Sequence, residues 1–241
     1  MEKTNYAVPV SIIIAGLLVA GAVIYNGSGF SSFGPNQAPT GNALVKNLSP
    51  ISATDNLTGA VDAELILVEY SDLECPFCKV FHQAMKNVMN KHSVSWVYRH
   101  YPIDSLHDKA RPEAEAAACV GKLGGDEKFW QYIDKIFTTT TSNDGLDLAM
   151  LPTFATEVGI TKEAYDACLT KGEGKAIVEA DEATANQIGV SGTPYPILID
   201  TDGRTHAIFE ENFNADTAKI SPEAKALITD LYAEYERIIR Q

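Results

Sequence analysis

Residues 65–79, LILVEYSDLECPFCK, hold the most informative pattern in this chain. Their apolar start predicts a central strand over residues 64–70 that is buried on both faces. Cys75 and Cys78 follow where a helix would begin, and side chains at this spacing face the same way on a helix. The two thiols can therefore form a disulfide and open it again without rebuilding the fold. Cys75 would lie among the unpaired N–H groups of the helix N-terminus, which favour a thiolate. The pair thus indicates a redox centre.

A metal site and a permanent disulfide are the alternatives for this motif. His82 could extend it toward a zinc site, but a closed zinc site needs four ligands. The other two cysteines, Cys119 and Cys168, stand alone and far apart in the sequence. A permanent disulfide across so short a loop would constrain the unfolded chain little. We therefore expect redox chemistry, with no metal and no cofactor.

Residues 7–25 form an uncharged, apolar run. At about 1.5 Å per residue, such a helix is roughly as long as the hydrocarbon core of a bilayer is thick. We expect residues 1–25 to form a retained membrane anchor with a single transmembrane helix. A cleavable signal peptide is the alternative, because Ala20-Gly21-Ala22 has the small-x-small form of a cleavage site.

The charges beside this span orient it weakly. Lys3 and the terminal amine precede it, Glu2 offsets part of their charge, and no charged residue follows until Lys46. This bias places the N-terminus in the cytoplasm and the rest of the chain outside it. The outer compartment is oxidising, which suits four cysteines able to form two disulfides. We therefore expect a single-pass protein of the cell membrane, or a secreted form if the segment is cleaved.

Residues 26–45 are rich in Gly, Ser, Asn and Pro and predict a flexible linker. The remaining residues 46–241 are enough for one domain with an insertion. The formal net charge of −13 argues against nucleic acid as a partner and against docking on anionic lipid. Contact with the bilayer is expected only through residues 7–25.

Strands and helices alternate along residues 46–241. An apolar stripe over 81–89 follows the cysteines on a predicted helix, and residues 94–101 predict the next strand. A long helical stretch then covers about 109–188, with a loop at 138–145. Residues 195–200 and 205–209, joined through Asp202-Gly203, predict a β-hairpin. Ser221-Pro222 predicts the start of a final helix.

This order of elements is that of an α/β, thioredoxin-like fold with a helical subdomain inserted at about 104–188. The stretch 68–79 resembles the active-site segment of the DsbA family of thiol–disulfide oxidoreductases. Gly192-Thr193-Pro194 lies just before the hairpin, where that family carries a cis-proline loop. Residues 98–102 and 128–130 resemble those of its membrane-tethered bacterial members. The resemblance covers about residues 50–210.

The resemblance implies roles for the residues around the thiols. Cys75, at an exposed helix start, would attack and form the mixed disulfide, and Cys78, one turn deeper, would resolve it. Pro76 and Phe77 would tune the redox poise. The family match implies a cis bond between Thr193 and Pro194 that presents the Thr193 backbone to a substrate peptide. The sequence alone would favour a trans turn.

Glu69 is a charged residue inside an apolar strand. It could simply face solvent, whereas the resemblance implies a buried carboxylate that relays protons beneath the disulfide. Arg99 or His100 on the adjacent strand is then its expected partner.

Cys119 and Cys168 fall in two different predicted helices. They could be two buried free thiols, since cysteine packs readily in a core. Outside the cytoplasm a structural disulfide is expected, and some relatives of the family carry one.

The leading functional prediction is an extracytoplasmic dithiol oxidase that acts on reduced exported proteins and is reoxidised by a membrane partner. An isomerase or reductase could use the same cysteines. The family's isomerases usually add an N-terminal dimerisation domain, for which the linker leaves no room, so we expect a monomer. A non-catalytic chaperone or soft-metal carrier is the alternative of another class. Lys79 and His82 would favour the Cys75 thiolate, and two nearby acidic residues would oppose it. The charge around the site therefore does not decide whether the protein oxidises or reduces its substrates.

Overall fold

The computed structural model describes residues 45–60, 62–209, 214–215 and 219–241. The predicted anchor at 1–25 and almost all of the predicted linker at 26–45 lie outside these residues. Within the described ranges, no helix is both long enough and apolar enough to cross a membrane.

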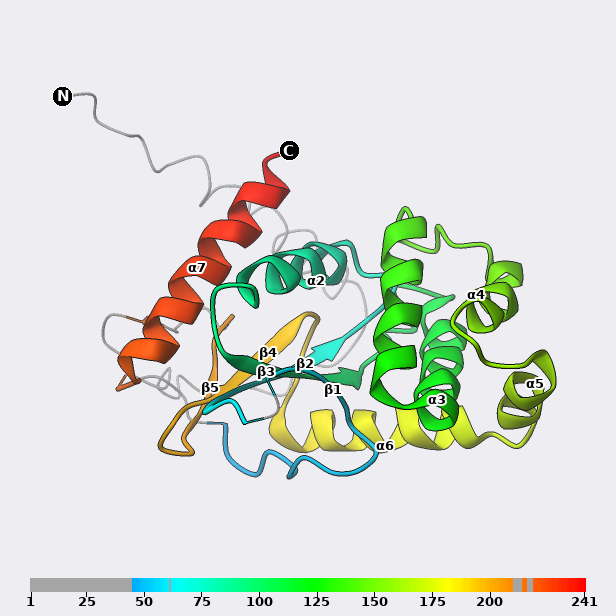
Figure 1. Cartoon of the computed structure of the whole chain (residues 1–241), viewed down its shortest axis with the longest axis horizontal. Coiled ribbons are helices and arrows are strands. Elements are labelled where there is room, and N and C mark those ends of the chain that lie inside the picture. Colours follow the sequence, from blue (N-terminus) through cyan, green and yellow to red (C-terminus); the bar gives the residue numbers. More distant parts are fainter. Residues whose placement is uncertain (1–44, 61, 210–213, 216–218) are drawn as a thin grey trace, which may run out of the picture. The chain divides into compact units, whose positions relative to one another are not determined.

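A five-stranded mixed sheet forms the centre of the domain, in the order β1-β3-β2-β4-β5 (Figure 1). The central strand β2 pairs in parallel with its neighbour β3, with Glu69 opposite Tyr98 in the register. All the other pairs are antiparallel. The strand bounds are β1 Asn56–Gly59, β2 Leu65–Ser71, β3 Val94–His100, β4 Tyr195–Ile199 and β5 Thr205–Ala207. The strand predicted at 205–209 therefore ends two residues early, and the predicted hairpin is confirmed.

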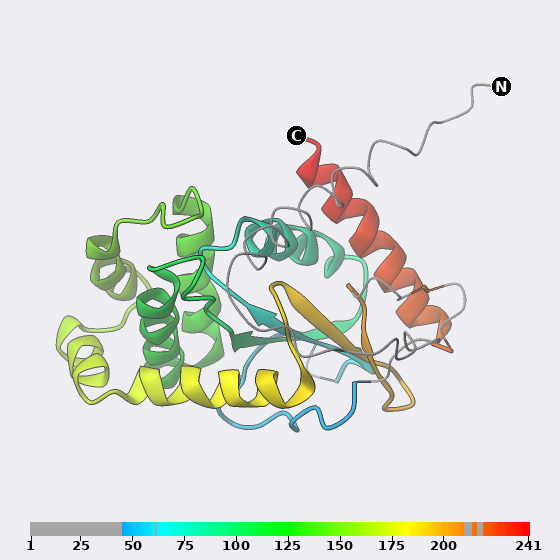
Figure 2. The same cartoon turned by 180° about the vertical axis from the view of Figure 1, so that it is seen from behind.

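Helices cover both faces of this sheet (Figures 1 and 2). Helix α2 (Pro76–Val88) and helix α7 (Pro222–Ile239) lie on one face, and α6 (Glu173–Ile188) crosses the other. Successive side chains of a strand point to opposite faces, so β2 contributes to two cores. Leu67 packs under α2 and α7, while Val68 packs against the α6 side.

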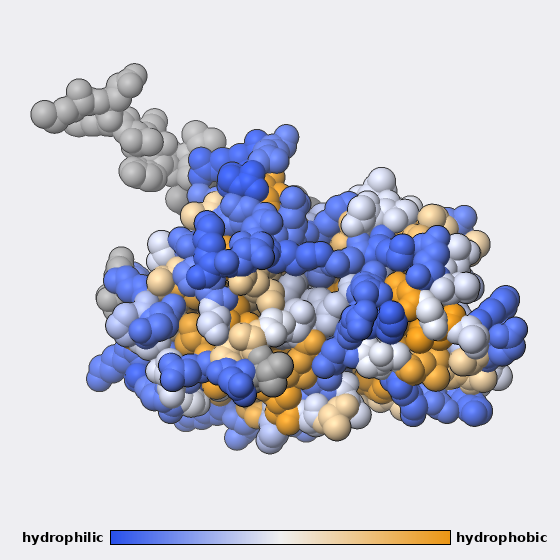
Figure 3. Space-filling model, viewed as in Figure 1, coloured by the Kyte–Doolittle hydropathy of each residue, from blue (hydrophilic) through white to orange (hydrophobic). Residues whose placement is uncertain are grey.

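The sequence signals for α2 and α7 are borne out. The predicted stripe on α2 is buried at Phe81, Met85 and Val88. Helix α7 begins as predicted, because the Ser221 hydroxyl accepts a hydrogen bond from the Ala224 N–H and Pro222 opens the first turn. On the face shown in Figure 3, the surface over α7 is predominantly hydrophilic.

The helical subdomain lies between β3 and β4 in the sequence. It contains α3 (Ala110–Thr139), the 3₁₀-helix η1 (Leu148–Met150), α4 (Leu151–Glu157), α5 (Lys162–Thr170) and α6. Helix α3 is kinked at Gly125, whose φ of 73° and ψ of −172° are not helical. The kink joins the two segments predicted at 113–119 and 126–137.

A disulfide and a close helix crossing hold this subdomain together. Cys119 of α3 and Cys168 of α5 are joined, with their Cα atoms 5.9 Å apart. Beside the disulfide, α6 crosses α3 so closely that a Cβ on Gly174 would lie 2.1 Å from the Glu115 carbonyl oxygen. Only glycine fits at that position.

Candidate active site

The two thiols lie where β2 passes into α2. Cys75 is the N-cap residue in an extended conformation, and Pro76 opens the first turn, where its missing N–H leaves no bond unmade. Cys78 is fully buried, and both cysteines are free thiols. The expectation of an exposed Cys75 is wrong, because only 5% of this residue is exposed. Phe77, between them, is 54% exposed and marks the outer surface of the site.

The cysteines have opposite acidities. The hydrogen bond from the Cys78 thiol is the largest cause that lowers the pKa of Cys75, to about 6, against the opposing effect of burial. The backbone N–H groups of Phe77 and Cys78 act in the same direction as the thiol, as expected at a helix N-terminus. Burial raises the pKa of Cys78 well above its ordinary value. At neutral pH, Cys75 is therefore mostly a thiolate and Cys78 a thiol.

A loop from the far end of α6 covers Cys75. The Thr193–Pro194 peptide bond in this loop is cis. The Thr193 carbonyl oxygen lies 3.5 Å from the Cys75 sulfur and accepts a hydrogen bond from its thiol form. Residues more than a hundred positions apart in the sequence thus meet at one sulfur atom, and this contact explains the low exposure of Cys75.

Beneath the thiols, Glu69 is buried on the α2 side of the sheet, with 1% of the residue exposed. Burial raises its pKa to about 8, so the carboxyl is mostly protonated at neutral pH. Burial also raises the pKa values of Cys78 and of the Tyr98 hydroxyl. The nearby Ser71 hydroxyl lowers the pKa of all three groups. The alternation of strand side chains places Ser71 on the same face as Glu69, a signal that the sequence analysis did not use.

The predicted partners of Glu69 are wrong. The Trp96 indole N–H donates to Glu69 Oε2 at 3.1 Å. Arg99 points to the other face, where it binds Asp55 at 2.7 Å. His100 packs edge-on against the rings of Tyr98 and Phe129. Trp96 and Arg99 are three positions apart, so they lie on opposite faces of β3.

Two buried carboxylates fix the segment that carries the thiols. Asp72 accepts hydrogen bonds from the N–H groups of Glu74 and Cys75. Glu74 accepts bonds from the Thr140 hydroxyl at 3.0 Å and from the N–H groups of Gly145 and Leu146 at 3.1 Å. These bonds attach the start of α2 to the loop that follows α3.

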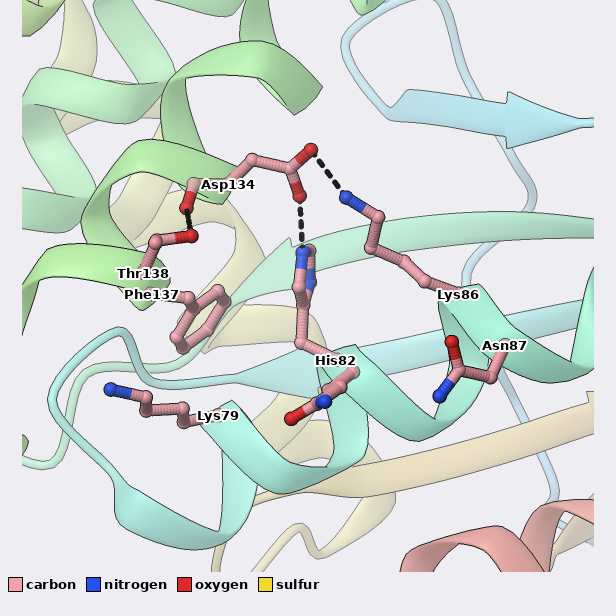
Figure 4. Close-up of a pocket in the computed structure, with 8 residues that line it drawn as sticks. Lys79, His82, Lys86, Asn87, Asp134, Phe137 and Thr138 are labelled. Atoms are coloured by element: carbon pink, nitrogen blue, oxygen red, sulfur yellow. Dashed lines mark hydrogen bonds and ion pairs between the residues drawn. The ribbon is translucent and has the colours of Figure 1, made fainter. Parts of the chain in front are cut away.

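The two basic residues expected to act on Cys75 extend from α2 toward α3 (Figure 4). Lys79 Nζ donates to the Thr140 carbonyl oxygen at 2.5 Å, and His82 Nε2 lies 2.6 Å from Asp134 Oδ1. They line a pocket of about 420 Å³ together with Phe137. Across the described part of the chain, no cluster of three or more His, Cys, Asp or Glu side chains could hold a metal ion.

We expect Glu69→Gln to stabilise the protein increasingly as pH rises. The folded protein keeps the Glu69 proton up to about pH 8, whereas the unfolded chain loses it near the ordinary value of 4.5. The folded state therefore loses stability as pH rises through this window, by roughly 3 kcal/mol at pH 7. Urea unfolding of both proteins at pH 4 and pH 8 measures the difference. Equal effects of the substitution at the two pH values would contradict a buried, protonated Glu69.

Sequence comparison finds relatives that this chain matches over only part of their length. The chain is 29% identical to the Na(+)/H(+) antiporter NhaA 1 of Mycolicibacterium gilvum (strain PYR-GCK) over 160 residues, which make up 65% of this chain and 25% of the antiporter. The chain thus spans about a quarter of the length of these curated relatives.

Comparison with solved structures identifies the fold. The structure of oxidised BdbD from Bacillus subtilis matches with a TM-score of 0.56 and 22% identity, over 82% of this chain and all of that one. The thiol–disulfide exchange protein alpha-DsbA2 from Wolbachia pipientis matches with a TM-score of 0.55 and 16% identity, over 77% of this chain and 87% of that one. The family model described as Thioredoxin matches residues 52–217. With its two thiols at the start of α2, the chain therefore belongs to the thioredoxin family and has the fold of the DsbA-type thiol–disulfide oxidoreductases.

Proposed function

We propose that this thiol–disulfide oxidoreductase is a dithiol oxidase that introduces disulfides into reduced proteins outside the cytoplasm. The observation that carries the proposal is the placement of Cys75 at the start of α2 with Cys78 fully buried behind it, which shifts their pKa values in opposite directions. A stable thiolate at Cys75 favours the reduced pair, which makes the disulfide form a stronger oxidant. The pKa of about 6 at Cys75 lies between the values of about 7 for thioredoxin and about 3.5 for DsbA.

The reaction begins from the Cys75–Cys78 disulfide. A substrate thiolate attacks the Cys75 sulfur, a mixed disulfide forms, and the Cys78 sulfur leaves with the electron pair. A second substrate thiolate then attacks the substrate sulfur of the mixed disulfide, and Cys75 leaves as a thiolate. Two substrate thiols become one disulfide, and the enzyme gains two electrons. The low pKa of Cys75 makes it the better leaving group in the second step.

The first step requires a proton at Cys78, because burial disfavours its thiolate. Glu69 is the proposed donor, since its carboxyl is mostly protonated at neutral pH. Ser71 lies on the same face of the sheet and lowers the pKa values of both groups, but its Oγ atom forms no hydrogen bond to either one within the described residues, so the proposed transfer is assigned to Glu69 alone. The same path, reversed, removes the proton when the disulfide forms again.

The proposed substrates are unfolded or reduced exported proteins. Thr193 would pair with the backbone of an extended substrate peptide beside Cys75, and Phe77 would contact its side chains. A membrane reoxidase would restore the disulfide after each cycle. We further propose that the protein is a monomer and that residues 7–25 hold it at the outer side of the cell membrane.

The reduction potential of the Cys75–Cys78 pair tests this proposal directly. We expect a value in glutathione buffers that lies between that of thioredoxin, near −270 mV, and that of DsbA, near −120 mV. Rapid oxidation of a reduced, unfolded model protein should accompany it. A potential as reducing as that of thioredoxin would exclude the oxidase. Faster reshuffling of a scrambled protein than oxidation of a reduced one would indicate an isomerase, and Cu(I) or Zn²⁺ binding without dithiol turnover would indicate a metal carrier.

A further inference from the structure

His107 lies in the turn between β3 and α3, and only 5% of it is exposed. Its Nδ1 atom is 3.0 Å from Asp72 Oδ2. The backbone on both sides is fixed, because the His107 N–H donates to the Ile103 carbonyl oxygen and the His107 carbonyl oxygen accepts from the Ala110 N–H. His107 lies 32 positions after Cys75, so its place in the sequence does not link it to the thiols.

Asp72 connects His107 to both thiols. One carboxylate oxygen, Oδ1, accepts a hydrogen bond from the Cys75 N–H at 3.2 Å. The Asp72 backbone N–H donates to the Cys78 sulfur at 3.5 Å. The other carboxylate oxygen receives the Ile103 N–H at 2.8 Å and faces His107. A buried carboxylate is therefore bound to the backbone N–H of the cysteine whose sulfur must carry negative charge.

Such a carboxylate would oppose the Cys75 thiolate unless a cation compensates it. Phe77, between the cysteines, has no charge. Lys79 and His82 are engaged on the α3 side. Among the hydrogen bonds found in the described ranges, His107 is the side chain bound to Asp72.

We infer that His107, held by Asp72, is a positioning residue whose positive charge stabilises the Cys75 thiolate and thereby links the redox poise of the pair to pH. The inference rests on the proposed oxidase function and names the group that tunes the same site. A basic residue from the β3–α3 turn thus supplies the charge that the Cys75-Pro76-Phe77-Cys78 motif lacks.

The charges that surround His107 support this role. Burial alone would lower its pKa, but Asp72, Cys75 and Asp144 outweigh burial and raise it. Asp144 belongs to the loop after α3, where it accepts a hydrogen bond from the Lys109 N–H. Lys109 Nζ, the nearby cation, donates to the Leu146 carbonyl oxygen. Because coupling between two sites is reciprocal, a thiolate that favours protonated His107 is itself favoured by protonated His107.

The redox step makes the coupling measurable. When a substrate dithiol reduces the Cys75–Cys78 disulfide, the pair gains two electrons, Cys78 gains a proton, and Cys75 keeps the negative charge. The reduced protein therefore holds the His107 proton more tightly than the oxidised protein does. The pKa of His107, followed by NMR in the wild-type protein, should be higher in the reduced form by roughly half a pH unit or more.

His107→Asn provides the complementary test, because the amide can still donate to Asp72 but carries no charge. We expect the pH midpoint of Cys75 alkylation by iodoacetamide to rise, with at least about threefold less thiolate below the midpoint. His92→Asn is the matched control, because His92 also pairs with an aspartate, Asp230 at 2.9 Å, but on the side of α7. That variant should keep the wild-type alkylation profile.

Three outcomes separate this inference from the proposed function. An unchanged alkylation midpoint in folded His107→Asn would overturn the inference while leaving the oxidase intact. Equal His107 pKa values in the two redox forms of the wild type would overturn it as well, even if the variant did not fold. A wild-type protein that oxidises no dithiol would instead remove the proposed function.

Discussion

Cys75→Ser is expected to abolish dithiol oxidation, with a loss of at least about a thousandfold, because the variant has no sulfur that can form the mixed disulfide. The oxygen that replaces it cannot form or accept a disulfide. The rate at which a reduced, unfolded model protein acquires disulfides measures the loss. Far-ultraviolet circular dichroism should be unchanged, since the N-cap position tolerates serine well.

Cys78→Ser provides the matched comparison for the two proposed roles. This variant keeps the Cys75 sulfur, to which the serine hydroxyl can still donate a hydrogen bond, but has no partner that can resolve a mixed disulfide. It should accumulate a covalent adduct with a disulfide-containing substrate, visible by mass spectrometry and released by reductant. Adducts that form in Cys75→Ser instead, through Cys78, would reverse the two assignments.

The double variant Cys119→Ala/Cys168→Ala is expected to lose about 4 kcal/mol of stability and to retain its activity at 25 °C. The cysteines are 49 positions apart, and the chain-entropy model assigns about 4 kcal/mol to a closed loop of this length. Urea unfolding, with the Cys75–Cys78 pair kept in one redox state, measures the difference. Both partners are replaced so that no free thiol remains to react.

This variant also tests where the redox centre lies. If the folded double variant lost dithiol oxidation as completely as Cys75→Ser, the structural role of the Cys119–Cys168 disulfide would be wrong. If its stability were unchanged, the loop-closure contribution would be offset by structure in the unfolded chain.

Elements of the fold could be predicted from the sequence wherever the local residue types determine the local backbone geometry. The apolar run of β2, the Asp202-Gly203 turn and the Ser221-Pro222 cap each placed an element correctly. Strand β1 was missed because Asn56–Gly59 has little preference for a strand, and its pairing with β3 alone holds it there. Local sequence contains no information about such pairing.

The sequence predicted those parts of the site that lie close together along the chain. The Cys75–Cys78 spacing and the apolar flanks of Glu69 could be read from one stretch. The structure places the cysteines at the start of α2 and buries Glu69, although Cys75 is less exposed than expected. The partner of Glu69 could not be predicted from the sequence, because strand register and the packing of α3 decide whether Trp96 or His100 reaches the Glu69 carboxyl group. His107 was missed for the same reason, since only the turn at residues 103–107 carries it back to Asp72.

Helix α6 has a mechanical consequence for the site. Gly174, near its first residue, lies against the Cys119 sulfur, and its last residue, Ile188, precedes Thr193 by five positions. A 16-residue helix is about 24 Å long and resists compression. Helix α6 is therefore a continuous connection between the helices joined by the Cys119–Cys168 disulfide and the segment that leads to the loop over Cys75.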